Sequence, residues 1–430
     1  MITKVLKSIK PVYFIFLILL LSLSIYLSFN AHCKIYSITL HHDGLGYYMY
    51  LPHVFIYHDF ILEPGEDISG YNVAQGTNQI FDKYTYGVSV MILPFFLISH
   101  FLAYLTGNSL SGFSMFYVIG VMMAAAFYLV LGMFFLIKIL SKYFRPAVVM
   151  LTLLAIYGGS NLYFYTIRDP AYSHVYSFFL FCLFIYLVPG FINSPTWKRS
   201  FLISMIFGLI FLIRPTNGVV LFYLILYEVY SKKDIIFKLR WLKQNMIKLL
   251  LLPVCCIVWM IPQLLYWHLV TNKWIVYSYI DEGFTFWDKP KIFHVLFSVQ
   301  NGMFVYAPIA FFSFIGLCIA FYKNKFSASA IILILALSTY LFASWWCWWY
   351  GGAYGHRGYI EFFAFLSIPT AYLISLLYLQ NPFIKFTGIS LILMCILYSM
   401  LLNYAYAWPW EGPNWTWNSL LNALLIAFRK

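Results

Sequence analysis

The sequence predicts an all-α polytopic membrane protein with about 11–13 transmembrane helices. Of its 430 residues, 63% are hydrophobic and 10% are charged, whereas an ordinary soluble domain has about 25% charged residues. That is too little charge to cover a water-facing surface, which excludes a soluble globular protein. Disorder is excluded as well, because it needs low hydrophobicity. Aromatic residues make up 22% of the chain, and Tyr and Trp favour membrane–water interfaces.

Each predicted span is a run of about 20 mainly apolar residues, the length that crosses a bilayer. The first run follows a basic start without a clean cleavage site, so we expect a retained signal anchor. Arg214 and Pro215 break the two short runs near 200–230, because proline ends or kinks a helix. The predicted runs are 12–30, 113–140, 147–166, 172–191, 200–213, 216–230, 249–270, 303–322, 327–346, 359–379 and 384–403.

A further apolar run, 86–105, bears on the orientation. The net charge is +13, and the positive-inside rule explains it if the basic loops face the cytoplasm. With a cytoplasmic N-terminus, this requires an even number of crossings between residues 31 and 112. Run 86–105 is then either re-entrant or paired with a second crossing near 45–61. The cytoplasmic loops would hold most of the Lys and Arg but only two acids, Glu228 and Asp234.

The opposite, external face would carry nearly all the unusual polar residues. It receives loop 31–85 and an aromatic tail, 404–430, within one membrane domain that covers 1–430. The segment HHDGLGYYMY in this loop places Asp43 beside His42, and Tyr47 and Tyr48 follow as candidate pocket walls. A carboxylate that caps the next helix is the structural alternative. A divalent metal held by His41, His42 and Asp43 is conceivable but not indicated, because adjacent residues rarely converge on one ion.

Three more external segments supply candidate cations. Lys83 opens run 86–105, Arg168 precedes Asp169 in TIRDPAYSH, and Arg214 interrupts an apolar run. Snorkelling at the interface or a local ion pair would also explain such residues. A charge inside an apolar run is costly, however, so we expect a functional role. His174, which closes TIRDPAYSH, joins the candidate pocket residues.

The segment SWWCWWYGGAYGHRGYIE, 344–361, is the most informative. An interfacial belt would explain its four Trp residues but not its glycines or its arginine. Arg357 lies at a predicted helix start after glycine-rich backbone and would hold a phosphate bidentately. Glu361 follows four residues later, a helical spacing that permits an ion pair with Arg357. Tyr350 and His356 complete the candidate pocket.

One acid and four cations on one face suit an amphiphile with a phosphate head and a long lipid tail. The acid would activate an acceptor hydroxyl as a general base, and the cations would neutralise the phosphate. These residues are Asp43, Lys83, Arg168, Arg214 and Arg357.

At this point the chain resembles integral-membrane glycosyltransferases of the GT-C superfamily. It is most similar to bacterial relatives of the dolichyl-phosphate-mannose protein mannosyltransferases and of the lipid A aminoarabinose transferases. The resemblance rests on Asp43 in a long loop after the first span, on Lys83 in DKYTYGVSVMILPFF, and on a multi-span body with an aromatic tail. The segments RDPAYSHVYSFFLF, IRPTNG and WWYGGAYGHRGYIE also resemble those of bacterial members. Two departures are Gly44, where the family often has a second acid, and Tyr84-Thr85, where it usually has a proline pair.

The resemblance implies a GT-C-like fold with interfacial helices in the first external loop. It implies that Asp43 is the catalytic base or orients the acceptor, that Lys83 lies near the donor phosphate, and that Asp169 matches a family acid less closely. The implied reaction transfers a hexose or pentose from a polyprenyl-phosphate donor to a glycan, lipid or protein acceptor, with inversion. It would occur outside a bacterial inner membrane, with the N-terminus in the cytoplasm.

No cofactor and no nucleic-acid partner is expected. Phosphate is the leaving group, and no nucleotide-binding fingerprint is present. Two other functions stay open, a lipid-linked glycan transporter or flippase and a glycan polymerase or ligase. Transporters often place ionisable residues near the bilayer midplane. The clustering of these residues at one face therefore favours surface chemistry.

Overall fold

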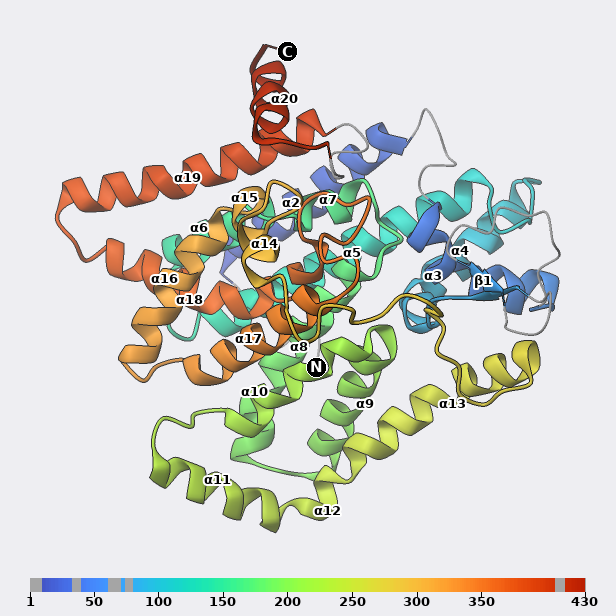
Figure 1. The fold of residues 1–430 in the computed structure, drawn as a ribbon, viewed down its shortest axis with the longest axis horizontal. Coiled ribbons are helices and arrows are strands. Elements are labelled where there is room, and N and C mark those ends of the chain that lie inside the picture. The colour runs from blue at the N-terminus through green and yellow to red at the C-terminus, as the bar shows by residue number, and fades with distance from the viewer. Residues whose placement is uncertain (1–9, 33–39, 61–70, 74–79, 407–413, 430) are drawn as a thin grey trace.

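The computed structural model describes residues 10–32, 40–60, 71–73, 80–406 and 414–429. Lys4, Lys7 and parts of loop 31–85 and tail 404–430 lie outside these ranges. The described chain is almost entirely helical (Figure 1). Its two short strands, β1 (Tyr71–Val73) and β2 (Ile80–Asp82), pair antiparallel, with Asn72 opposite Phe81.

Six described helices are long and apolar enough to cross a membrane. These are α2 (Pro11–His32), α4 (Gly87–Leu105), α5 (Met115–Leu140), α8 (Ser173–Asn193), α13 (Leu251–Thr271), which continues α12 (Met246–Leu249), and α19 (Pro382–Ala405). The shorter helices include α6 (Pro146–Gly158), α7 (Leu162–Ile167), α9 (Trp197–Ile213), α15 (Met303–Tyr306), α16 (Ile309–Tyr322), α17 (Ala328–Ser344) and α18 (Phe363–Leu377). The prediction of an all-α polytopic membrane protein is confirmed.

Prolines set the breaks between several predicted spans. Run 303–322 divides into α15 and α16 because Pro308 disfavours helical backbone at Ala307, which has φ −135° and ψ 67°. The predicted break near 200–230 is present: α9 ends at Ile213, and Arg214 is extended, with φ −151° and ψ 108°. The chain resumes after it as η3 (Pro215–Val220) and α10 (Leu221–Leu226).

The basic loops gather at one end of the helix bundle, which we call the basic end. The Tyr13 hydroxyl at the start of α2 accepts a hydrogen bond from Ser141, just after α5. The Arg145 guanidinium and the Lys385 ammonium both lie over the Tyr378 ring. The opposite end, called the site end, is where α8 begins and α9 ends. The amphipathic helix α11 (Lys232–Gln244) and the C-terminal helix α20 (Trp417–Arg429) lie at opposite edges of the molecule (Figure 1).

Helix α4 covers only half of α5. Its first residue, Gly87, packs on Ile213 at the site end, and the Tyr128 hydroxyl donates to the Met91 carbonyl. Near its other end, His100 contacts Tyr117, in the first turn of α5. Helix α4 therefore runs away from the basic end, which α5 reaches at Ser141. This path fits an even number of crossings between residues 31 and 112.

Helix α3 (His42–Pro52) and η2 (His53–Tyr57) follow the same path as α4. The Tyr47 carbonyl accepts from Ser89 in the first turn of α4. Farther along, the Tyr48 hydroxyl donates to the Gly112 carbonyl and the Tyr57 hydroxyl to the Ser111 carbonyl. The segment after α2 thus carries helices that begin at the site end and lead away from the basic end.

Candidate active site

Asp43 and Arg357, more than 300 residues apart in the sequence, form an ion pair at the site end. Arg357 Nη1 lies 2.6 Å from Asp43 Oδ2. Asp43 lies in the first turn of α3, and Arg357 begins the short helix η4 (Arg357–Tyr359). Their side chains are 23% and 16% exposed, respectively, so both charges are partly withdrawn from water but open to a ligand.

Two glycines let the start of α3 approach its neighbours closely. A Cβ added at Gly46 would lie 2.5 Å from the Tyr84 ring, and one at Gly44 would lie 2.9 Å from the Ala171 side chain. These two glycines therefore serve packing in this structure. Because neither glycine has a side chain, Asp43 can lie beside Tyr84 and Tyr172.

The surroundings of Asp43 favour its charged form. Burial raises the pKa of its carboxyl, but the Arg357 charge, a hydrogen bond from Tyr84 and the Lys83 charge together outweigh burial. The net result is a pKa below the usual value. Asp43 is therefore a carboxylate at neutral pH and is held in place by two side chains that point at it.

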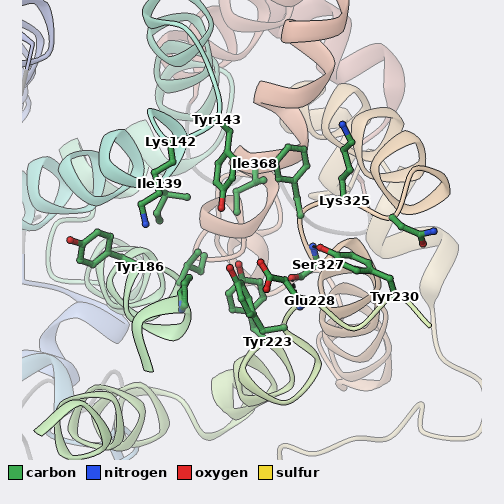
Figure 2. A pocket seen from close by; sticks show the side chains of 15 residues that line it. Ile139, Lys142, Tyr143, Tyr186, Tyr223, Glu228, Tyr230, Lys325, Ser327 and Ile368 are labelled. Carbon is green, nitrogen blue, oxygen red and sulfur yellow. Dashed lines mark hydrogen bonds between the residues drawn. The ribbon is translucent and has the colours of Figure 1, made fainter. Parts of the chain in front are cut away.

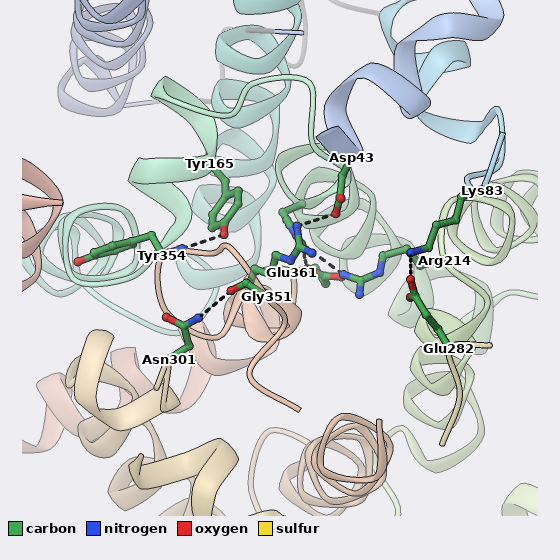
Figure 3. A network of polar contacts seen from close by, with 11 residues as sticks. Asp43, Lys83, Tyr165, Arg214, Glu282, Asn301, Gly351, Tyr354 and Glu361 are labelled. Atoms are coloured by element: carbon green, nitrogen blue, oxygen red, sulfur yellow. Dashed lines mark hydrogen bonds and ion pairs between the residues drawn. The ribbon is translucent and has the colours of Figure 1, made fainter. Parts of the chain in front are cut away.

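Glu361 is the centre of a second, deeper cluster. Its carboxylate is fully buried and accepts from Arg214 at 3.1 Å and from Asn217 at 3.2 Å. The His174 ring nitrogen Nδ1 lies 3.1 Å from the other carboxylate oxygen. Figure 3 shows Asp43, Arg214 and Glu361 converging on one region. A buried carboxylate with three polar partners is fully satisfied, so this cluster fixes the ends of α8, α9 and α18 relative to one another.

The spacing of Arg357 and Glu361 does not produce the ion pair that it permits in an α-helix. Residues 357–359 form a 3₁₀ turn, and α18 begins only at Phe363. Without a continuous α-helix, positions four apart do not share a face. Arg357 consequently pairs with Asp43, whereas Glu361 pairs with Arg214.

A third ion pair ties two loops together near Asp43. Lys83 pairs with Glu282, and its ammonium lies 4.8 Å from the centre of the Tyr279 ring. The Ser278 hydroxyl donates to the Lys83 carbonyl at 2.7 Å. Residues 278–282 thus pack against the segment that carries Lys83 (Figure 3).

Asp169 at the site end has a carboxyl that is near half-protonation at neutral pH. Burial and the neighbouring Asp43 charge raise its pKa to about 7, although Arg357 and Arg168 oppose the shift. It makes no ion pair within 4.0 Å among the described residues. A carboxyl with a pKa near the working pH is suited to proton transfer.

Three other predicted site residues lie near the ion pairs. The centre of the Tyr350 ring lies 5.9 Å and 6.0 Å from the Arg214 and Arg357 guanidinium groups. The Tyr47 ring packs at a tilt against that of Tyr84, with 4.4 Å between ring centres. His42 begins α3 with φ 45°, and its ring lies next to that of His41.

Three predicted residues point elsewhere. Tyr48 is fully buried, and its hydroxyl donates to the Gly112 carbonyl, away from Asp43. His356 Nε2 bonds the Trp348 carbonyl, so this ring holds the glycine-rich loop together. Arg168 lies over Phe164, 5.9 Å from the ring centre, and makes no ion pair within the described chain.

Four residues of the site were not among its predicted members. Tyr84 hydrogen-bonds Asp43, Asn217 bonds Glu361, and Glu282 pairs with Lys83. Tyr279 covers Lys83. Asn217 stands in the IRPTNG segment, whose polarity was a usable signal. The segment YIDEG around Glu282 carried only the weak signal of paired acids in a predicted external loop.

No group of three His, Cys, Asp or Glu side chains in the described ranges is arranged to hold a metal ion. Protein-family models and curated protein sequences yield no match to this chain.

Proposed function

We propose that the protein transfers a sugar from a polyprenyl-phosphate donor to an acceptor at the external membrane surface. The observation that carries the proposal is the juxtaposition of Asp43 with Arg357, with Lys83 and Arg214 beside them, at the end of the bundle away from the basic loops. The ion pair places a base next to a cation that can bind phosphate, and Lys83 and Arg214, each paired with a carboxylate of its own, lie beside it. The aromatic walls formed by Tyr47, Tyr84 and Tyr350 suit a sugar ring.

The ion pair between Asp43 and Arg357 implies that the donor binds before Asp43 acts as a base. A phosphate can take two parallel hydrogen bonds from a guanidinium group, so the donor competes with Asp43 for Arg357. Once Arg357 binds phosphate, Asp43 loses the cation that lowers its pKa most. Burial then raises the pKa of its carboxyl, which makes Asp43 a stronger base only when the donor is bound.

The transfer step follows from these positions. Asp43 accepts the proton of the acceptor hydroxyl while the acceptor oxygen bonds to the anomeric carbon. The bond from that carbon to the phosphate oxygen breaks, and its electron pair leaves with the lipid phosphate. Arg357 and Lys83 stabilise the charge that develops on the leaving phosphate. Attack from the face opposite the leaving group inverts the configuration at the anomeric carbon.

A release assay tests this proposal directly. The purified full chain, given a polyprenyl-phosphate sugar and a crude envelope acceptor fraction, should release polyprenyl phosphate. Asp43→Asn should slow release by about 10³-fold, within the range for loss of a general base. Asp288→Asn, at an exposed position in another loop, is the matched control and should release at the wild-type rate.

Each arm of the assay has a clear contrary result. Full turnover by Asp43→Asn would refute the role of this residue as the base. Binding of the donor followed by its movement across a vesicle membrane, without release of lipid phosphate, would support a transporter instead. A folded Asp43→Asn variant that still binds the donor but releases no polyprenyl phosphate would support the proposal.

A further inference from the structure

A cavity lined by both charged and apolar side chains lies at the basic end, on the far side of the bundle from Asp43. Its volume is about 210 Å³, and one water needs only about 10–15 Å³. The ends of α5, α8 and α10 and the turn between α16 and α17 converge on it. Helix α8 separates the two sites: His174 at its start contacts Glu361, and Tyr186 and Pro189 near its end line the cavity.

The exposed carboxylate of Glu228 lines this cavity beside three tyrosines, Tyr143, Tyr223 and Tyr227. Tyr227 shares hydrogen bonds with the Glu228 side chain and with Tyr143. Burial and then the Glu228 charge raise the pKa of the Tyr143 hydroxyl, so the two side chains lie close. Figure 2 shows Tyr143, Tyr223 and Glu228 pointing into the same space. A carboxylate among tyrosine rings and hydroxyls is the chemistry that binds an ammonium group.

Two lysines in the lining carry the opposite charge. Lys142, from the turn after α5, and Lys325, from the turn before α17, both line the cavity. Each side chain is exposed, and neither makes an ion pair among the described residues. Their ammonium groups lie over the rings of Tyr186 and Tyr372. Two exposed lysines are suited to a phosphate, for which Lys acts as a point charge.

The backbone around the cavity is held in a costly conformation. Glu228, Asn324, Phe326 and Ser327 all have φ between 51° and 56°. Non-glycine residues rarely adopt positive φ, and such strain gathers at ligand sites. The Ser327 hydroxyl accepts from the Glu228 N–H at 2.9 Å and keeps the two strained segments together.

One neighbouring cation is already present. The Lys238 ammonium on α11 lies over the rings of Tyr227 and Trp241, and the Glu228 charge acts on it. Burial lowers the pKa of Lys238 to about 8, so part of its population is neutral near that pH. The Tyr227 ring therefore already contacts a cation.

We propose that this cavity binds the headgroup of an aminophospholipid from the leaflet at the basic end. The ammonium group lies against Glu228 and the tyrosine rings, and the phosphate lies between Lys142 and Lys325. The apolar wall formed by Ile139, Ile185 and Ile368 faces the start of the acyl chains. Because one lining carries a carboxylate and two lysines that form no ion pair among the described residues, a ligand that satisfies both signs is zwitterionic, which excludes a purely anionic lipid as the preferred one.

Native mass spectrometry of the full detergent-purified chain tests the proposal. Phosphatidylethanolamine and phosphatidylglycerol are added separately, since only the first has an ammonium group. The wild type should bind phosphatidylethanolamine about tenfold more tightly, the effect of roughly one charge-assisted contact. Equal binding of the two lipids by the wild type would overturn the proposal.

Two variants separate the contribution of the carboxylate from that of the lysines. Glu228→Gln should remove the preference between the lipids, and Lys325→Gln should weaken both by about tenfold. Lys323→Gln, two residues away and outside the lining, and Asp288→Asn are the matched controls, which should bind like the wild type. Retention of the preference in a folded Glu228→Gln variant would contradict the proposal.

Soluble phosphoethanolamine distinguishes a lipid from a free metabolite with the same headgroup. If the acyl chains contribute, it should displace the lipid only at about 100-fold or greater excess, a difference of about 3 kcal/mol. Displacement at equal concentration would overturn the assignment to a lipid.

Discussion

The two ends of the bundle hold their charges in different ways. At the site end, Asp43, Glu361 and Glu282 are each paired with a cation, in contacts that join segments distant in the sequence. At the basic end, Glu228, Lys142 and Lys325 line one cavity and form no ion pair among the described residues. The paired charges at the site end are organised before a ligand arrives, and an anionic ligand there must displace a carboxylate from its cation. At the basic end, in our proposal, the carboxylate and the two lysines gain a charged partner when the lipid headgroup binds.

The largest expected effect is the loss of turnover when Arg357 at the site end is substituted. Arg357→Gln removes the group that holds Asp43 and, in our proposal, the donor phosphate. We expect turnover to fall by about 10³-fold, the loss typical of one stabilising donor in a transition state. Arg357→Lys keeps the charge but loses the bidentate geometry and should recover only part of the rate. Release of lipid phosphate measures both; wild-type turnover in Arg357→Gln would remove this residue from the mechanism.

The second effect is structural and concerns Glu361. Glu361→Gln leaves the largely buried Arg214 without its carboxylate, and breaking a buried pair typically costs about 3–5 kcal/mol. We expect a clear drop in the thermal unfolding midpoint, read by intrinsic fluorescence in detergent. Asp234→Asn changes an exposed acid at the end of the molecule that holds α11 and should cost much less. Similar midpoints for the two variants would show that the Glu361 cluster is not a structural anchor.

The third effect depends on pH and concerns Asp169. Its pKa is raised to about 7 in the folded protein, above the usual value of about 4. The folded state therefore holds a proton that the unfolded state releases, so this residue lowers stability as pH rises from about 4 to about 7. Asp169→Asn removes this pH-dependent loss of stability. Above pH 7 its free energy of unfolding should exceed that of the wild type by about 1–2 kcal/mol, after allowance for solvent screening.

Unfolding midpoints of the wild type and Asp169→Asn at a series of pH values measure this effect. The two curves should meet near pH 4 and separate steadily toward pH 7. A constant difference across that range would mean that the Asp169 carboxyl titrates as it does in the unfolded chain.

The smallest effect is expected at the ion pair between Lys83 and Glu282, whose side chains are 15% and 29% exposed. Partly exposed pairs contribute about 0–1 kcal/mol. A double-mutant cycle with Lys83→Met and Glu282→Gln should give a coupling energy in that range. Lys83→Met should nevertheless raise the KM for the donor, whereas Glu282→Gln should not. If both variants changed the KM equally, the role of Lys83 would be only to hold the two loops together.

The sequence by itself determined the membrane class and most helix positions. Long apolar runs have only one stable outcome in lipid, because helices satisfy their own backbone hydrogen bonds. The break at Arg214 and Pro215 was predictable for the same local reason: proline lacks the N–H that continues a helix. The grouping of the basic loops at one end also followed from charge counting along the chain.

Only the tertiary structure decided which charges meet. Arg357 and Glu361 have helical spacing, yet they pair with Asp43 and Arg214 because the 3₁₀ turn at Arg357 turns them in different directions. Glu282 and Tyr84 entered the site through contacts between distant loops, which no local pattern encodes. Local propensity and hydrophobic periodicity are properties of neighbouring residues, so they are written in the sequence. Ion pairs depend on how helices pack, and packing depends on the shapes of side chains throughout the bundle.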